Sequence, residues 1–542
     1  HISSSFLKST FEEVWREEGE VLDRVCRTRF RSPGDVNQYV MKYWQYMEGK
    51  YEPQSPKIGK FFTIGLHDRQ IHDVLRNQKC KILCINDTEN IGDNRKEISK
   101  ILLRVSFPKS LHLNYLTKIP EACMTKSAIK KYTERLGFFG MILHYICRFI
   151  TKTEQQVIGK LTVRFGKAKK NRLVFKNREM MDCTDNPEAF YEYLISSGYN
   201  KKYEIIWLVS EKRKFRNQNT GNVKFVTAEN KYGWSSPLAY YYGATAGFFF
   251  YSHNSAGLNR YRCKGQTVVN LWHGCGYKDA EQGKKKQNIK PDFDYALVPG
   301  PVFVKTKSGL WNCEPDRLLM MGYPRYDWML HPSMSKDEIL DSLFGWKGKK
   351  AVLWMPTFRK SDLGGCAENE IELPCQLPAI QNMNELKELD SYLREQEIIL
   401  IIKKHPLQTE WDENEQEFTN IRYVAEALLE KKQIKLYELI GISDGLLSDY
   451  SSVAVDYLLL DRPLGYVLAD YNIYKEKRGF VFEDPLEYMP GEKIYNACDI
   501  RKFMKHLTDG TDSYRQERAK NLKQMHNKTE NYCKRLADYL QL

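Results

Sequence analysis

The sequence predicts an α/β protein in which two doubly wound domains follow one another, with a smaller α+β segment in front of them. From about residue 171, short apolar runs alternate with helical patterns, which is typical of βαβ units and parallel sheets. The alternation stops in a polar, irregular stretch after residue 325 and then resumes, which indicates a second sheet and a cleft between the two. The length of 542 residues leaves room for two to four domains.

The strands and helices can be placed in order along both series. In the first domain, expected at 171–335, a helix at 186–196 accompanies strands at 172–175, 205–209, 223–226, 247–252, 267–271, 295–298 and 318–321. In the second domain, expected at 336–542, the strands are at 351–355, 398–402, 445–448 and 464–467. We expect the last basic helical segment, 512–542, to pack back across the hinge.

Residues 1–120 form the α+β segment, with one clear strand, KILCIND, at 81–87. Part of this segment resembles the C-terminal conserved portion of Stealth-type sugar-phosphate transferases, which make capsular polysaccharide. The matching pieces are RFRSPGDVNQYVMKYWQ (29–45), SPKIGKFF (55–62) and CINDT (84–88). The upstream segments of that family are absent, and the chain begins at His1 rather than Met. We therefore expect either an inactive remnant or the tail of a longer catalytic domain.

Residues 121–170 are basic and amphipathic. Within them, 128–150 mixes phenylalanine, isoleucine and leucine with lysine and arginine, and it is too short and too charged to span a bilayer. Two hypotheses remain open. The segment either lies on an anionic membrane surface, with its basic residues on the headgroups, or it is a buried helix that docks against the next domain.

Composition limits the partners and the compartment. A net charge of +14 favours an acidic partner, such as a nucleotide, an anionic lipid or a polyanionic polymer. No basic and aromatic residues are interleaved on strands, so we expect no nucleic-acid partner. Thirteen cysteines without a C-x-x-C pair, and no signal peptide, indicate a reducing interior. We expect a cytoplasmic protein, peripheral on the inner face of the cell membrane.

The candidate catalytic and binding residues lie in polar turns directly after strands. Open parallel sheets bind ligands there, beyond the carboxyl ends of their strands. In NLWHGCGYK (270–278), the backbone freedom of Gly274 and Gly276 lets His273 project from such a turn. Histidine suits general base work near neutral pH. The alternative is a structural histidine that caps the turn. A metal is not expected here, since no second ligand stands at metal-binding spacing.

Two further turns, in WMPTFRK (354–360) and IIKKHP (401–406), present hydroxyl, guanidinium, ammonium and imidazole groups. Such groups bind phosphate, arginine in a bidentate manner. The alternative in both places is an ordinary turn with solvated basic side chains. The candidate phosphate ligands in these two turns are Thr357, Arg359, Lys403 and His405.

The fourth turn, LSDYSS (447–452), directly precedes an apolar helical run. Asp449, Ser451 and Ser452 are residues that cap helix N-termini, where free N–H groups and the positive end of the helix dipole bind phosphate. The alternative is that these side chains only cap the helix.

Taken in order, these motifs resemble the CDP-glycerol glycerophosphotransferase family of teichoic acid and capsule polymerases. The resemblance covers nearly all of 169–530 and rests on WHG, GYPR (322–325), PTFR (356–359), KHP (404–406), SDYSSVAVDYLLLDRP (448–463) and RGFVFEDPLEYMPGE (478–492). One departure is local: the family more often has Thr-Pro after WHG, where this chain has Cys275 and Gly276.

The resemblance implies a GT-B fold and the transfer of a polyol phosphate to the terminal hydroxyl of a polyanionic polyol-phosphate chain, with release of CMP. CDP-glycerol or CDP-ribitol would be the donor. His273 and His405 would be catalytic, and the donor phosphates would be held by Thr357, Arg359, Ser451, Ser452, Asp449, Arg325 and Lys403. No cofactor is required, and the sequence does not decide Mg²⁺ dependence. The alternative is a GT-B glycosyltransferase that uses a nucleotide sugar.

Overall fold

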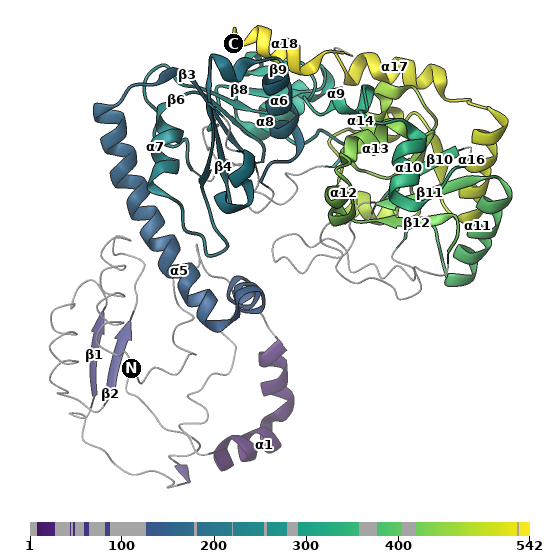
Figure 1. Ribbon diagram of the computed structural model, residues 1–542. Helices are drawn as coiled ribbons and strands as arrows, with labels where there is room; N and C mark the ends of the chain where they lie inside the picture. Colours follow the sequence, from purple (N-terminus) through teal and green to yellow (C-terminus); the bar gives the residue numbers. More distant parts are fainter. Residues whose placement is uncertain are drawn as a thin grey trace. The chain divides into compact units, whose positions relative to one another are not determined.

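The computed structural model forms two compact units, residues 1–126 and 127–542, which are considered separately (Figure 1). The described residues are 8–27, 44, 47–48, 59–63, 82–86, 126–177, 182–218, 221–253, 257–278, 291–348, 350–356, 377–403, 418–477, 479–527 and 530–542.

The N-terminal unit contains helix α1 (Lys8–Arg27) and strands β1 (Gly59–Thr63) and β2 (Ile82–Asn86). The two strands pair in parallel, with Phe61 opposite Cys84. The strand predicted at 81–87 is therefore confirmed as β2. Val14 and Leu22 of α1 are buried together.

The first sheet of the larger unit has seven strands, all paired in parallel, in the order β5-β4-β3-β6-β7-β8-β9. Its central strands are buried on both faces, as apolar runs such as EIIWLV require. The strand order reverses between β3 and β6. The strands are β3 (Lys169–Lys176), β4 (Glu204–Val209), β5 (Val223–Thr227), β6 (Ala246–Tyr251), β7 (Thr267–Asn270), β8 (Tyr295–Val298) and β9 (Leu318–Met320).

The second sheet has six parallel strands in the order β12-β11-β10-β13-β14-β15. Both sheets thus have the doubly wound strand order, and the reversal here lies between β10 and β13. The strands are β10 (Lys350–Met355), β11 (Ile398–Lys403), β12 (Ile421–Val424), β13 (Gly445–Ser448), β14 (Leu464–Val467) and β15 (Glu492–Ile494).

The apolar runs that were predicted as strands in both domains are strands in the structure, so the predicted pair of doubly wound domains is confirmed. Among the described strands of these two sheets, β12 and β15 were missed, which are the outer strands of the second sheet. Each is short and carries polar residues, with sequences IRYV and EKI. In the N-terminal unit, β1 was missed as well.

The helices pack on both sheets (Figure 1). On the first domain they are α6 (Asp185–Ser196), α7 (Pro237–Thr245), α8 (Val302–Trp311) and α9 (Tyr326–Leu330). On the second they are α10 (Lys336–Phe344), α11 (Met383–Glu395), α12 (Glu426–Lys432), α13 (Leu436–Ile442), α14 (Ser452–Tyr457), α15 (Tyr471–Lys477), α16 (Ala497–Asp509) and α17 (Arg515–Met525). Short 3-10 turns lie at Tyr199–Lys201, Lys212–Gln218, Pro315–Arg317, Leu458–Leu460 and Pro485–Tyr488.

The last helix, α18 (Tyr532–Tyr539), returns to the first domain. It packs against α6 and α9, and the backbone N–H groups of Tyr532 and Cys533 donate to the carboxylate of Asp327. The segment predicted as one basic helix, 512–542, is therefore divided between α17 and α18, with the chain crossing from one domain to the other between them.

Helix α5 (Lys126–Phe165) leads into the first domain and has two different faces. One face docks on this domain: Gly159 lies directly against the ring of Tyr261, and Arg148 forms an ion pair with Glu229. The membrane hypothesis requires an exposed apolar surface, and the helix has one as well. Its exposed apolar residues are Leu143, Ile146, Phe149, Ile150, Val157, Leu161, Val163 and Phe165. Among the described helices, none is both long and apolar enough to cross a bilayer.

Candidate active site

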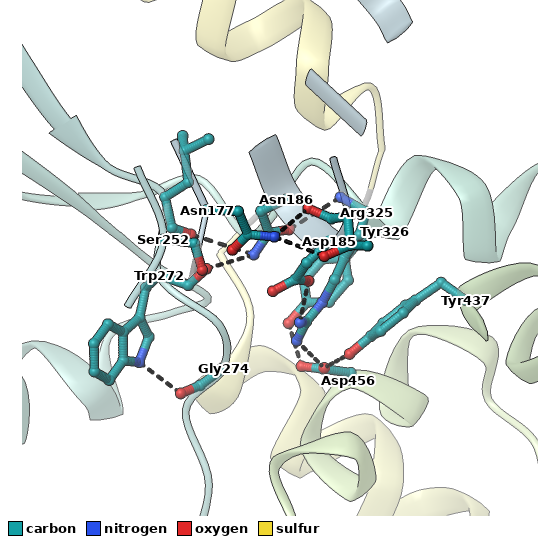
Figure 2. Close-up of polar contacts among 12 residues, drawn as sticks. Asn177, Asp185, Asn186, Ser252, Trp272, Gly274, Arg325, Tyr326, Tyr437 and Asp456 are labelled. Carbon is teal, nitrogen blue, oxygen red and sulfur yellow. Dashed lines mark hydrogen bonds and ion pairs between the residues drawn. The ribbon is translucent and has the colours of Figure 1, made fainter. Parts of the chain in front are cut away.

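The turn that follows β7 carries His273 and is held from several sides. Asn270, the last residue of β7, accepts a hydrogen bond from the N–H of Trp272 at 2.9 Å. The indole N–H of Trp272 donates to the carbonyl of Gly274 at 2.7 Å, and Asn186 of α6 donates to the carbonyl of Trp272 at 2.7 Å (Figure 2). Trp272 and Gly274 have φ of 51° and 137°, so this turn needs the glycine at 274.

The imidazole of His273 lies among aromatic rings and is half-buried. The ring of His253 is parallel to it, with centroids 3.9 Å apart and an angle of 7° between the planes. The ring of Trp272 is 4.0 Å away and tilted by 39°. Sequence reasoning missed His253, although the same signal was available. His253 follows the apolar strand β6, as His273 follows β7.

The His273 turn touches the second domain at the start of α14. A methyl group added to Gly276 would lie 2.9 Å from the backbone nitrogen of Ser452, and one added to Gly274 would lie 2.6 Å from the Ser452 hydroxyl oxygen. The structure thus brings together two of the four predicted turns, one from each domain. No side chain could stand at Gly274 or Gly276 without pushing the turn and the helix apart.

The residues predicted to cap α14 take different positions. Ser451 is the N-cap residue, but its side chain makes no capping hydrogen bond, so a purely capping role is not what the structure shows for it. Ser452 is the first residue of the helix, and both serines are half-buried beside the His273 turn. Asp449 is fully buried after β13, two residues before the cap position.

Arg325 has carboxylate partners from both domains. Its guanidinium bonds to Asp185 at 2.6 Å and to Asp456 of α14 at 3.0 Å (Figure 2). Asp456 is fully buried and also accepts hydrogen bonds from the hydroxyls of Tyr326 and Tyr437. Burial opposes the charge, but the neighbouring carboxylates still raise the pKa of Arg325 above its ordinary value.

Arg325 was predicted to bind the donor phosphate, which stays a prediction, and the structure shows what its terminal nitrogens contact. Both of its terminal nitrogens are bonded to carboxylates, and its side chain is 6% exposed. One of these nitrogens would lie 3.4 Å from a methyl group on Gly274, so the guanidinium stands directly behind the His273 turn. It joins the two domains at the site, and sequence reasoning did not find its partners Asp185 and Asp456.

Of the other predicted phosphate ligands, the structure describes Lys403. Lys403 ends β11 and is 5% exposed, with its ammonium 3.1 Å from a carboxylate oxygen of Glu426 on α12. Its predicted contact with a phosphate stays a prediction. Thr357, Arg359 and His405 lie outside the described residues.

A second contact between the domains lies beside the first. The hydroxyl of Tyr277 is 3.0 Å from that of Tyr466 on β14 and donates to the carbonyl of Tyr488 at 2.9 Å. The next residue, Lys278, pairs with Phe480 as an isolated antiparallel bridge. Within the described part of the chain, no group of three or more His, Cys, Asp or Glu residues is arranged to hold a metal ion.

Together these contacts place the His273 turn of one domain against a helix start from the other, at the carboxyl ends of two parallel sheets. A family model described as CDP-Glycerol:Poly(glycerophosphate) glycerophosphotransferase matches residues 160–537. The chain belongs to this family. The resemblance inferred from the ordered motifs of this sequence is thereby confirmed.

Known glycerophosphotransferase relatives agree with this assignment. The teichoic acid poly(glycerol phosphate) polymerase of Staphylococcus epidermidis is 25% identical over 387 residues, covering 68% of this chain and 50% of that protein. The solved structure of the wall teichoic acid polymerase TagF is 20% identical and has a TM-score of 0.56. It covers 77% of this chain and 98% of that one, which confirms the GT-B fold.

The N-terminal part has a different relative. Capsular polysaccharide phosphotransferase WcwK of Streptococcus pneumoniae is 36% identical over 111 residues, covering 20% of this chain and 33% of that protein. This confirms the Stealth-type resemblance of the N-terminal segment. The chain thus spans half or less of the length of these two curated relatives.

Proposed function

We propose that this protein transfers a polyol phosphate, glycerol phosphate in the first instance, from a CDP-polyol to the terminal hydroxyl of a teichoic-acid-like or capsular polymer, and releases CMP. One observation carries the proposal. The His273 turn of the first domain lies in contact with Ser452 at the start of α14 in the second. The contact supports a shared site for the proposed base and the proposed phosphate-binding serines, in a chain of the glycerophosphotransferase family.

In the proposed reaction, the acceptor hydroxyl attacks the phosphorus that carries the polyol, in line with the leaving CMP. His273 takes the proton of that hydroxyl, which as general base catalysis contributes about 10²- to 10⁴-fold. Ser451 and Ser452 bind the donor phosphates, together with Thr357, Arg359 and His405. The greater part of the rate comes from positioning and from stabilisation of charge on the leaving group.

The buried ion pairs of Arg325 support this division of labour. They join Asp185 of the first domain to Asp456 of the second, directly behind the His273 turn. In this proposal, they keep the base and the phosphate site at a fixed separation. Arg325 acts here through the other groups rather than on the donor itself.

The test is to incubate the chain with CDP-glycerol, CDP-ribitol and other CDP-polyols, together with a polyol-phosphate primer, and to measure CMP and product mass. CMP release with CDP-glycerol is expected, and His273→Ala should abolish it while the fold is retained. His331→Ala is a matched control, because His331 is an exposed histidine at the end of α9. Turnover in His273→Ala would refute the role of His273.

The same panel separates the alternative, a glycosyltransferase that uses a nucleotide sugar. Release of UDP from a UDP-sugar, with no CMP from any CDP-polyol, would favour that alternative. We also propose that the reaction needs no resident metal. If so, EDTA leaves CMP release unchanged, and loss of turnover that Mg²⁺ restores would contradict this.

We further propose that α5 holds the protein on the anionic inner face of the membrane. The support is the exposed apolar face of the helix, which includes Ile146, Phe149 and Leu161, with exposed basic residues beside it. The docked face of the same helix fixes this surface to the first domain, through the contact of Gly159 with Tyr261 and the ion pair of Arg148 with Glu229.

Vesicle sedimentation tests the membrane proposal. The wild type is expected to sediment with phosphatidylglycerol vesicles, and a variant with serine at Ile146, Phe149 and Leu161 should stay in solution. Leu238→Ser is the matched control, since Leu238 is an equally exposed apolar residue on α7. Equal sedimentation of the wild type and the triple variant would contradict the proposal.

A further inference from the structure

His253 is placed where a ligand-binding residue is expected, although no known role accounts for it. It comes two residues after the end of β6, one of the two strands between which the order of the first sheet reverses. Loops at such a switch point border the ligand crevice in doubly wound sheets. The ring of His253 does not stand alone there, because it lies parallel to that of His273 at 3.9 Å.

The imidazole of His273 is covered on both of its faces. The rings of His253 and Trp272 have centroids 3.9 Å and 4.0 Å from it. Two rings this close to one centroid cannot share a face without overlapping. His273 is therefore held between His253 and Trp272, and only its edge is left for a substrate.

Both covering rings are anchored to rigid parts of the first domain. The Nδ1 atom of His253 is 2.8 Å from the hydroxyl of Ser252, which is fully buried, and the Ser252 backbone N–H bonds to the carbonyl of Lys176 on β3. His253 itself has φ of 56°, a left-handed conformation that histidine adopts more readily than most residues. Trp272 is fixed by its indole bond to Gly274.

We propose that His253 is a positioning residue that fixes the ring plane of His273, so that one ring nitrogen points at the acceptor hydroxyl. The last torsion of a histidine side chain is broad and is held weakly by its own bonds. A base that must meet a hydroxyl within hydrogen-bond distance therefore needs its ring plane set from outside. This inference rests on the proposed function, in which His273 is the base.

Two substitutions separate the effect of the ring from that of its nitrogens. His253→Asn suits the left-handed backbone and keeps a polar group near Ser252, but removes the ring. It is expected to lower kcat for CMP release by about tenfold or more, since a misplacement of about 1 Å can cost about a hundredfold, with KM for CDP-glycerol little changed. His253→Phe keeps a flat ring, in a left-handed conformation that phenylalanine adopts less readily than histidine, so its stability is measured first. The folded variant is expected to retain most of kcat. His331→Asn is the control and should change neither constant.

Two outcomes overturn the proposal. One is wild-type kcat in a folded His253→Asn. The other is an equal loss in His253→Phe and His253→Asn, which would mean that the nitrogens of His253 themselves contact the substrate. Thermal unfolding of each variant shows whether a loss of activity is merely a loss of fold.

A second readout does not depend on turnover, so it also holds if no CDP-polyol releases CMP and the proposed function fails. In protein labelled with ¹⁵N-histidine, the ring signals of His273 are identified by their absence in His273→Asn. They are expected to shift in His253→Asn, because the ring current of the stacked neighbour is lost, and to shift less in His253→Phe. Unchanged His273 signals in His253→Asn would refute the stack.

Discussion

Gly276 offers a direct test of the contact between the two domains. Its backbone is not in the left-handed region, so alanine brings no conformational strain there. The added methyl group would meet backbone atoms of Ser452, at 2.9 Å from the nitrogen and 3.0 Å from Cα. Neither atom can turn away as a flexible side chain would. The turn that carries His273 and the start of α14 must therefore separate.

The size of the effect follows from these distances. Ordinary contact begins at 3.4 Å, so a gap of 2.9 Å requires a separation of about 0.5 Å. A misplacement of about 1 Å can cost about a hundredfold in rate. If the activation free energy rises in proportion to the displacement, about half that displacement costs about tenfold. Gly276→Ala should thus lower kcat for CMP release by about tenfold, which is about 1.4 kcal/mol of activation free energy.

The assay is CMP release from CDP-glycerol at saturating donor, with circular dichroism as the check on folding. Gly309→Ala is the matched control, because Gly309 lies in α8 with no atom within 4 Å of an added methyl group. It should leave kcat unchanged and make the helix slightly more stable. Wild-type kcat in a folded Gly276→Ala would refute the reasoning that close contact between turn and helix is needed.

Two further predictions concern stability. Arg325 is 6% exposed, and Asp456→Ala removes one of its two carboxylate partners in this network, so that Asp185 remains. The substitution should therefore lower the free energy of unfolding in urea by about 3–5 kcal/mol. Burial lowers the pKa of His526, so protonation favours the unfolded chain. Stability is then complete above the unfolded pKa of about 6.5 and is lost as the pH falls towards the folded value. His526→Gln cannot titrate and should show a smaller drop in urea midpoint between pH 7.5 and pH 5.5.

Each of these has a result that would contradict it. The control for Asp456 is Asp538→Ala, since Asp538 is an exposed partner of Lys534 on α18 and its loss should be nearly neutral. Equal destabilisation by the two substitutions would contradict the buried-pair argument. For His526, the same pH dependence in wild type and His526→Gln would show that other groups cause the drop.

The inner strands of both sheets could be predicted from the sequence, because a continuous apolar run such as IILII is typical of a strand that is buried on both faces. The outer strands β12 and β15 could not. IRYV and EKI pair with one neighbour only and keep polar side chains at the surface, so they show neither a continuous apolar run nor a long alternation.

Some residues of the candidate site could likewise be predicted from the sequence, and others could not. His273 was predictable, since its place after a strand determines where it lies. The partners of Arg325 were not, because Asp185 and Asp456 are 140 and 131 residues away in the chain. Asp185 meets it only when the first domain folds, and Asp456 only when the two domains pack. His253 was within reach, but a single histidine after a strand gives no sign of the ring that it will stack on.

The return of α18 to the first domain also limits how the cleft can move. The chain passes between the domains once between α9 and α10, and again between α17 and α18. At the second passage, His526 bonds to the carbonyl of Val455 in one domain, and Asn527 bonds to that of Pro299 in the other. The two domains are thus joined by two passages of the chain rather than one, and at the second passage neighbouring residues are bonded to opposite domains. Any opening of the cleft must therefore strain both connections at once.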